Sequence, residues 1–513
     1  MSYGADILGI TEETFSLVKA VTAGIDTTSA IAGIDLLDDI MSLVPVDTPF
    51  FNSTPRGPGK GSRAVLWQTL LNVNSSQSYR ATPADQAGTL ANIENQWIYS
   101  PYQSIGTGGK VTWDAIAQGE GQADVLAVDT LQTINQHLIK LEVNQINALP
   151  FALPAVGNPT LVPSSTGGSI GAVTVYVACA ARSPYNWYNG GSGVASTVEN
   201  TGALTGTTNS VSASVAPVKL AAGYDWWVGT ASGSLFYYST TSVPAVTITS
   251  VPTTNAVVPA LTGLYGAGVA FANPITSVNT VPTTDSSYES DCTLGLLASI
   301  LGDWSSTPDD PFSGGGGTAV SYTTPGAGVS QGAYYEDLAG GQLSVQGAGF
   351  TQIDTMNKSI YDKYQVTPSR MLMGSQVITD FANAFLDNPQ AVLWMTPDAR
   401  DGRLAGVMGG HVATYANKTV NGKPIELWLM PYLPPGIIVS LIDSLPFPGS
   451  NVTTALQVRT QYDFFRFDYG ANRQLNTSDG GPRYDFEIRS RQAQVNKAAP
   501  VMGVLSGIGA GIA

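Results

Sequence analysis

Charged residues are scarce in this sequence. They make up 12% of the 513 residues, against about one quarter in an average soluble chain. The 38 acidic residues outnumber the 23 basic ones, and the formal net charge is −15. Sequence-specific binding of nucleic acid needs a basic surface, so this balance argues against it. Few charges together with 56 glycines favour a β-rich protein whose surface is partly covered, for example by other copies of itself.

Cysteine and histidine are also rare. Two cysteines, Cys179 and Cys292, are too few for a disulfide scaffold. Cys179 ends an alternating apolar run, Val173–Cys179, which predicts a buried free thiol. The two histidines, His137 and His411, lie far apart, and no HExxH, GxSxG or Cys/His cluster occurs. The sequence therefore predicts that the protein is not an enzyme and that it binds no metal and no cofactor.

Long apolar runs are absent as well. No stretch of 18 or more apolar residues occurs, so neither a transmembrane helix nor a membrane partner is expected. The first residues, MSYGADILGITEETF, lack the basic start and the apolar centre of a secretion signal. Secretion is therefore not expected.

Residues 56–62, RGPGKGS, have the composition of a phosphate-binding loop. Such a loop requires Ser or Thr directly after the lysine, and a helix directly after the loop. Here Gly61 follows Lys60, and the next residues are typical of a strand. No helix N-terminus is available to bind phosphate, so nucleotide binding is not expected.

The segment 62–112 is interpreted as a long hairpin. Residues 62–73 and 92–111 have the composition of strands, and a polar segment with proline and glycine joins them. Two-stranded ribbons are marginally stable by themselves in water. The hairpin is therefore expected to lie on another part of the molecule or on another molecule.

Two regions before and after this hairpin are predicted to be helical. Residues 5–45 favour short helices, with Thr11 and the acids after it as a helix-start signal. The clearest helix covers residues 120–148, where apolar residues recur at steps of three and four and define one face. They are Val125, Val128, Leu131, Ile134, Leu138 and Leu141.

Residues 151–290 differ sharply in composition from the rest. This region holds only six charged residues, and Ser, Thr, Gly, Val and Ala dominate it. Alternating segments separated by turn residues predict a β-sandwich inserted in the chain. The pair Trp226–Trp227 is the expected anchor of its core.

From residue 291 onwards helix and strand patterns alternate. Residues 366–387 predict a strand, then Gly374, then a helix. Residues 411–445 predict a hairpin with Asn421–Gly422 as its tight turn, followed by another strand. Residues 455–471 and 483–496 predict the last strands. These last strands would complete a sheet begun far earlier in the chain, which indicates two interleaved domains.

The order of these elements resembles that of the major capsid proteins of tailed bacteriophages, which have the HK97-type fold. SLVPVDTPFFNSTPRG is similar to the family's N-terminal arm, residues 62–112 to its extended loop and residues 120–148 to its spine helix. VTPSRMLMGSQVITDFANAF and YANKTVNGKPIELWLMPYLPPGIIVSLID are similar to segments of the axial domain. ALQVRTQYDFFRFDYGANR resembles the returning strands of the peripheral domain. The resemblance covers residues 35–150 and 290–495.

The resemblance implies an α+β, HK97-like fold with an inserted all-β sandwich of immunoglobulin or fibronectin type. The expected parts are an N-terminal arm (1–61), an extended-loop hairpin (62–112), a peripheral domain with the spine helix (113–150), the sandwich (151–290), an axial domain (291–450), and returning peripheral strands with a C-terminal tail (451–513).

It also implies a structural protein of the virion capsid. Copies would assemble in the bacterial cytoplasm, as hexamers and pentamers, into an icosahedral shell around double-stranded DNA. Other partners would be a portal protein and a separate scaffolding or decoration protein, with only non-specific contact to the packaged DNA. The candidate contacts between copies are Arg63, Trp67, Tyr79, Arg80, Trp97 and Tyr99. Gly57, Gly59 and Gly61 would form the hinge of the extended loop.

Two other classes of protein stay open on the sequence alone. A secreted β-rich adhesin or surface-layer protein would explain the Ser/Thr/Gly-rich sandwich but requires a secretion signal. A carbohydrate-active enzyme with a binding module at residues 151–290 requires a pair of carboxylates in a cleft.

Overall fold

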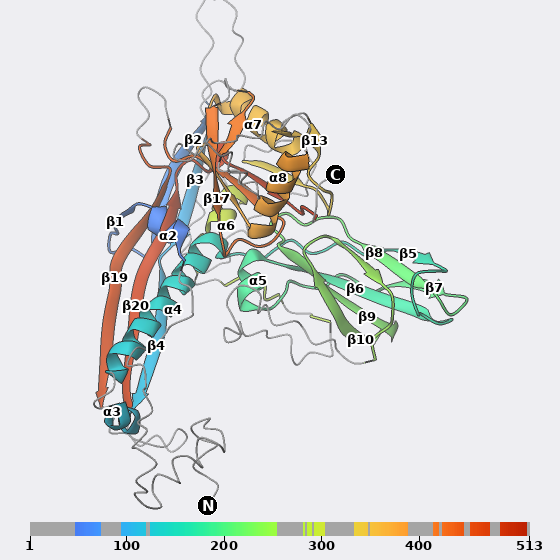
Figure 1. Cartoon of the computed structure of the whole chain (residues 1–513), viewed down its shortest axis with the longest axis horizontal. Coiled ribbons are helices and arrows are strands. Elements are labelled where there is room, and N and C mark those ends of the chain that lie inside the picture. The colour runs from blue at the N-terminus through green and yellow to red at the C-terminus, as the bar shows by residue number, and fades with distance from the viewer. Residues whose placement is uncertain are drawn as a thin grey trace, which may run out of the picture.

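The structure is a computed structural model. It describes residues 47–72, 94–119, 124–253, 281–282, 285–289, 292–302, 333–346, 349–387, 414–419, 423–445, 452–471 and 483–509. The first 46 residues, with most of the expected arm and its short helices, lie outside the described residues. Figure 1 shows an elongated sheet with a helix along it, a hairpin, a compact sheet with two helices, and a two-sheet domain at one side.

The elongated sheet, here called the long sheet, has the strand order β1-β19-β20-β4. Its strands are β1 (Arg56–Pro58), β19 (Leu456–Ala471), β20 (Arg483–Asn496) and β4 (Gln103–Thr112). β4 pairs with β20 from Gln103↔Gln492 to Thr112↔Arg483. The prediction that the last strands complete a sheet begun far earlier in the chain is therefore confirmed.

Helix α4 (Val125–Asn147) packs along the long sheet, and the short helix α3 (Trp113–Gly119) precedes it. The Asp124 carboxylate accepts the N–H groups of Leu126 and Ala127, so the helix starts with an N-cap. The predicted helix is confirmed, but the predicted apolar face is wrong at Leu131, which is 57% exposed. The enclosed face carries polar residues instead, among them His137 and Glu142, because they have partners on the strands and on the arm.

The hairpin consists of β2 (Ala64–Asn72) and β3 (Glu94–Pro101), which pair antiparallel. It is shorter than the predicted segment 62–112. The N–H of Tyr102 donates to the carbonyl of Arg63 and closes the base of the hairpin. Beyond that residue the chain changes partner, and β4 joins β20 in the long sheet. The tip of the hairpin lies outside the described residues.

The two-sheet domain contains seven described strands and one helix. One sheet has the order β10-β9-β6-β7 and the other β11-β8-β5. The strands are β5 (Thr160–Ser164), β6 (Thr174–Arg182), β7 (Glu199–Ala203), β8 (Ser210–Ser214), β9 (Gly223–Ala231), β10 (Ser234–Thr241) and β11 (Ala245–Ile248), and the helix is α5 (Pro184–Asn189).

Both sheets of this domain contribute to one apolar core, so a sandwich of two packed sheets is present. The expected immunoglobulin strand order is not found among the described strands. In an immunoglobulin domain the first, second, fourth and fifth strands share a sheet. Here the second, third, fifth and sixth share one. The expected anchor is confirmed, because Trp226 and Trp227 are both buried, in clusters on opposite faces of β9.

The compact sheet has the order β12-β21-β18-β15-β17-β16. Its strands are β12 (Tyr334–Asp337), β21 (Gly503–Ser506), β18 (Ile438–Leu441), β15 (Arg370–Met373), β17 (Lys423–Leu429) and β16 (Thr414–Asn417). Helices α7 (Thr351–Tyr364) and α8 (Ser375–Asp387) belong to this part, and β13 (Val345–Gln346) pairs with β14 (Gly349–Phe350) beside α7.

One boundary differs from the expected domains. Residues 503–506 were expected in a tail after the peripheral strands, yet β21 lies between β12 and β18 inside the compact sheet. Its four residues are fully enclosed, which is why this end of the chain is part of the core. Helix α6 (Leu296–Leu301) is six residues long and packs against α4 and β20.

One apolar core runs through the molecule. It joins Ile146 of α4, Leu297 of α6 and Val504 of β21 with Trp226 and Val177 of the two-sheet domain. The two-sheet domain is therefore held to the rest of the chain by buried apolar contacts. The sequence pattern had indicated an inserted domain but not this continuity.

Candidate functional site

The hairpin residues expected to contact a neighbouring copy are only partly placed by the structure. Arg63 is exposed at the hairpin base. Trp67 is half-buried on its own chain, where its Nε1 donates to the carbonyl of Asn496 at 3.0 Å. Tyr79 and Arg80, and the side chains of Trp97 and Tyr99, lie outside the described residues. Part of the Trp67 side chain is therefore bound within the same copy, and its contact with a neighbouring copy stays a prediction.

The glycines expected to form a hinge are mostly held in place. Gly57 lies in β1, paired with Arg459 of β19, and a methyl group there would overlap the side chain of Gln457. The N–H of Gly59 donates to the carbonyl of Thr460 at 2.7 Å. Both glycines therefore lie close to β19 in this structure, and their role as a hinge stays a prediction. Gly61 has open space around it and keeps that role as a prediction.

The long sheet has one face covered by α4 and one open face. On β20, Phe486, Ile488 and Ser490 are buried, and Ser490 Oγ lies 2.9 Å from Nε2 of His137 on α4. Side chains alternate along a strand, so Glu487 and Arg489 point to the opposite face. On β19 the residues paired with these two are Phe467 and Phe465.

The open face carries a row of exposed aromatic residues, here called the aromatic stripe: Phe465, Phe467 and Tyr469. Their exposed fractions are 53%, 38% and 56%. The rings of Phe465 and Phe467 form an edge-to-face pair with centroids 4.6 Å apart. A bulge before Phe465 leaves Phe464 with a φ of 43° and turns its ring toward His137 and Phe51 instead. The stripe is therefore an exposed apolar patch on a sheet face.

Polar groups hold the aromatic stripe in position. The Tyr469 hydroxyl donates to Glu487 Oε2 at 2.6 Å, and Arg489 Nε donates to Glu487 Oε1 at 2.6 Å. The Arg489 guanidinium also lies 5.7 Å from the centre of the Phe467 ring. The hydrogen bond from Arg489 lowers the pKa of Glu487, so this carboxylate stays charged near neutral pH. The sequence signal for the stripe was the alternation in DFFRFDYG, which was interpreted only as a strand.

His137 lies inside the molecule rather than at a reactive site. Its Nδ1 is 3.1 Å from Thr107 Oγ1, and its Nε2 contacts Ser490. Burial lowers the pKa of His137 to about 4, so the ring is neutral at physiological pH. The interpretation of this residue as structural fits these contacts. The other histidine, His411, lies outside the described residues.

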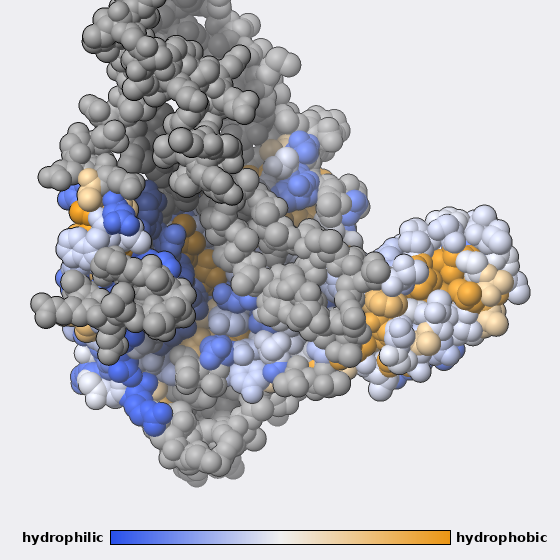
Figure 2. All heavy atoms as spheres, turned by 90° about the horizontal axis from the view of Figure 1, so that it is seen from below, coloured by the Kyte–Doolittle hydropathy of each residue, from blue (hydrophilic) through white to orange (hydrophobic). Residues whose placement is uncertain are grey.

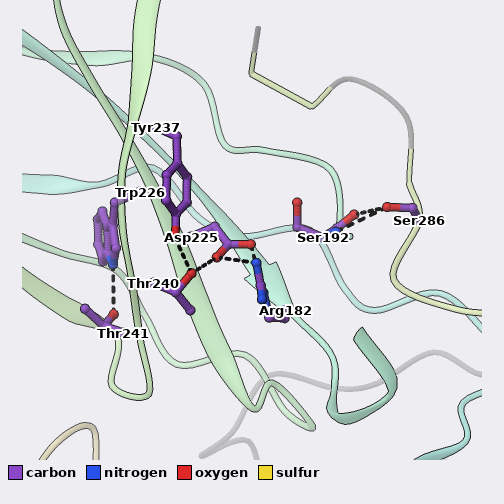
Figure 3. Close-up of polar contacts among 8 residues, drawn as sticks. All are labelled: Arg182, Ser192, Asp225, Trp226, Tyr237, Thr240, Thr241 and Ser286. Atoms are coloured by element: carbon purple, nitrogen blue, oxygen red, sulfur yellow. Dashed lines mark hydrogen bonds and ion pairs between the residues drawn. The ribbon is translucent and has the colours of Figure 1, made fainter. Parts of the chain in front are cut away.

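Figure 3 shows the buried polar network of the two-sheet domain. Arg182 Nε donates to Asp225 Oδ2 at 3.1 Å, and the Thr240 hydroxyl donates to Asp225 Oδ1. The Tyr237 hydroxyl contacts Thr240, and Trp226 Nε1 donates to Thr241 at 2.9 Å. Arg182 and Asp225 are almost completely enclosed, so this network orders the strands and is not accessible to a substrate.

The described residues contain no group of three or more His, Cys, Asp or Glu side chains arranged to hold a metal ion. Both cysteines are buried and free, as predicted for Cys179. Burial raises the pKa of each thiol, which keeps both protonated. None of the helices in the described ranges is both long enough and apolar enough to cross a membrane.

No protein-family model matches the chain. No curated protein matches it either. Solved structures do match over nearly the whole length. The capsid asymmetric unit of cyanophage A-1(L) has 11% identity and a TM-score of 0.43, covering 93% of this chain and 97% of that chain. The capsid of a native GTA particle has 7% identity and a TM-score of 0.40, covering 95% and 98%. A structure of Gordonia phage Cozz has 7% identity and a TM-score of 0.38, covering 93% and 91%.

Proposed function

We propose that this chain is a structural protein that assembles with other copies of itself into a shell, as the major capsid protein of a tailed phage. The observation that carries the proposal is the arrangement of the described parts: a hairpin, a long sheet lined by one helix, and a compact sheet built from distant segments. This is the order of elements expected for an HK97-type protein. The proposal assigns to this chain the role of a capsid protein, and its support is the architecture of the chain itself.

In this proposal the long sheet with α4 is the peripheral domain, and the compact sheet with α7 and α8 is the axial domain. The β2–β3 hairpin is the extended loop. The two-sheet domain is a lateral addition, and Figure 2 shows it as a pale lobe with an apolar band, while strongly hydrophilic residues gather on other parts. This pale surface agrees with its few charges, of which Arg182 and Asp225 are paired and buried.

In this proposal the protein functions by burying surface between neighbouring copies of the chain. The aromatic stripe supplies partly exposed apolar area on the face of the long sheet opposite α4. Full burial of one such aromatic side chain contributes about 1.5–3 kcal/mol. Contacts of this size become strong when symmetry repeats them around a closed shell.

The proposed partners follow from this function. Copies would form hexamers and pentamers, a portal protein would occupy one vertex, and a separate scaffolding or decoration protein would complete the shell. The shell would enclose double-stranded DNA without sequence-specific contacts, which suits a net charge of −15. The protein would lie in the virion capsid after assembly in the bacterial cytoplasm, and it would need no enzymatic activity and no cofactor.

Purification of the full chain followed by sedimentation and negative-stain microscopy tests the proposal. Rings of five or six copies, or closed shells, are expected once the protein is concentrated. A protein that remains a single, uniform monomer at every concentration and salt condition contradicts it. The adhesin alternative predicts that monomeric result.

A further inference from the structure

Glu142 of α4 is completely buried and contacts the start of the described chain. Its Oε1 accepts the N–H of Phe50 at 2.9 Å, and its Oε2 accepts the N–H of Phe51 at 2.6 Å. Both amides belong to the first turn of helix α2 (Pro49–Ser53), where N–H groups have no partner within the helix. Thr48, at the N-cap, makes no side-chain hydrogen bond to them. Glu142 thus caps α2 from a different helix, and α2 lies against α4 in Figure 1.

We propose that Glu142 is a proton-operated latch, which binds residues 47–54 of the arm to α4 and holds them more firmly as the solution becomes mildly acidic. The latch works within one copy of the chain. It therefore goes beyond shell formation and does not depend on it.

The buried carboxylate has no ion-pair partner in the part of the chain that the structure describes. An unpaired buried charge is costly, and proton uptake removes that cost. The charged or titratable groups on the elements packed around this junction are Asp47 in the arm, Arg56 on β1, Asp463 on β19, and His137 and Lys140 on α4.

These neighbours do not neutralise the charge of Glu142, because they interact with other groups or are themselves negatively charged. Arg56 pairs with Asp463 and lies over the Phe51 ring, 3.7 Å from its centre. Lys140 donates to the carbonyl of Gly106 at 3.2 Å. Asp47 carries the same charge as Glu142 and raises its proton affinity further. Among the described residues no cation pairs with Glu142, so residues 47–54 are anchored on a carboxylate whose charge proton uptake would remove.

The sign of the pH dependence follows from burial. Burial raises the pKa of Glu142 from 4.5 to about 7, although the N–H groups of Phe51 and Phe50 act in the opposite direction. A released arm would expose the carboxyl group to water and return it toward the ordinary value. The proton therefore binds more tightly in the latched state, so the latch is strongest below pH 7 and weakens as pH rises through 7.

Release of residues 47–54 from α4 would be a local and rare opening of the structure. Phe50 is part of the main apolar core, and opening would expose it. The latch should therefore be visible in amide hydrogen exchange before any change in overall structure. His137 stays neutral over this range because burial lowers its pKa to about 4, so it adds no transition of its own.

Hydrogen exchange followed by mass spectrometry on the full chain tests the latch. The readout is the protection of a peptide covering residues 47–54, corrected for the intrinsic exchange rate at each pH. Between about pH 5.5 and about pH 8.5 protection should fall on the order of 30-fold, the ratio expected for a group whose pKa moves from 4.5 to about 7. A peptide from β20 in the same samples should change little. Equal protection of the arm at both pH values in the unaltered protein overturns the proposal.

Two variants assign the effect to Glu142. Glu142→Gln removes the titratable group, so protection of the arm should become independent of pH, whatever its absolute level. Glu426→Gln changes an exposed carboxylate on β17 and should keep the full pH dependence. A transition that persists in Glu142→Gln, or a parallel loss of protection in β20, contradicts the latch. Because the readout is local exchange in single copies, it is independent of whether shells form.

Discussion

At the scale of single residues, a few buried polar groups organise a molecule that has little charge. Arg182 and Asp225 form an ion pair inside the two-sheet domain, with Thr240 as a third member. Glu142 caps the arm helix, and His137 bridges α4 to two strands of the long sheet. Buried polar groups of this kind are costly when one partner is missing, so each one favours a single arrangement of its strands.

The ion pair in the two-sheet domain leads to a prediction on stability. Asp225→Asn leaves the buried Arg182 charge uncompensated and should lower the free energy of unfolding by about 3–5 kcal/mol. The transition can be followed by tryptophan fluorescence, because Trp226 and Trp227 are buried beside the pair. The exposed pair Arg466–Asp468 provides the matched control, and Asp468→Asn should change stability by less than about 1 kcal/mol. Equal effects of the two variants would contradict a structural role for the buried pair.

At the scale of elements, β4 shows how glycine permits close packing. Gly109 lies opposite Phe486 of β20. A methyl group at Gly109 would overlap the Phe486 ring and come within 2.8 Å of Asp129 on α4. The neighbouring Gly108 points to the open face, where the nearest atom would be 3.9 Å away. Two adjacent glycines therefore have different requirements, because one faces α4 and the other faces solvent.

This difference predicts opposite outcomes for two similar substitutions. Gly109→Ala forces the buried ring or α4 to move and should destabilise the long sheet by about 1–3 kcal/mol. Gly108→Ala adds a methyl group in open space and should be neutral or slightly stabilising, as expected for alanine in place of glycine in a strand. Thermal unfolding of the two variants side by side measures this. Equal loss of stability would mean that α4 does not cover the face assigned to it.

At the scale of the whole molecule, the aromatic stripe is the strongest candidate surface for contact between copies. The double variant Phe465→Ser and Phe467→Ser should leave the fold intact, since both rings are exposed. It should weaken each contact between copies by about 3 kcal/mol, or roughly 100-fold. Light scattering against protein concentration would then show assembly shifted to higher concentration.

Val162 serves as the matched control for that prediction. It is 59% exposed on β5 of the two-sheet domain, far from the long sheet in Figure 1. Val162→Ser should leave the concentration dependence unchanged. If Val162→Ser blocks assembly and the stripe variant does not, the contact surface lies on the two-sheet domain instead.

The sequence by itself predicted the kinds of elements and several of their residues. Helical spacing indicated α4, alternation indicated the strands of the two-sheet domain and of β19 and β20, and the buried positions of Cys179 and Trp226 followed from the same patterns. These signals are local, because a helix or strand repeats its buried face every few residues. Scarcity of charge likewise pointed to a surface that other molecules cover.

Only the tertiary structure decided which strands pair and which faces remain open. β4 was assigned to the hairpin, but its partner is β20, which lies 371 to 389 residues later in the chain, from Thr112↔Arg483 to Gln103↔Gln492, and no local pattern encodes that pairing. β21 joined the compact sheet for the same reason. An alternating residue pattern does not tell which of the two faces of a strand is buried when both faces carry apolar residues. The aromatic stripe could be recognised as exposed only because α4 covers the opposite face of the long sheet. The sequence determines the elements because their periodicity is local, and the tertiary structure determines the surfaces because pairing and coverage depend on distant residues.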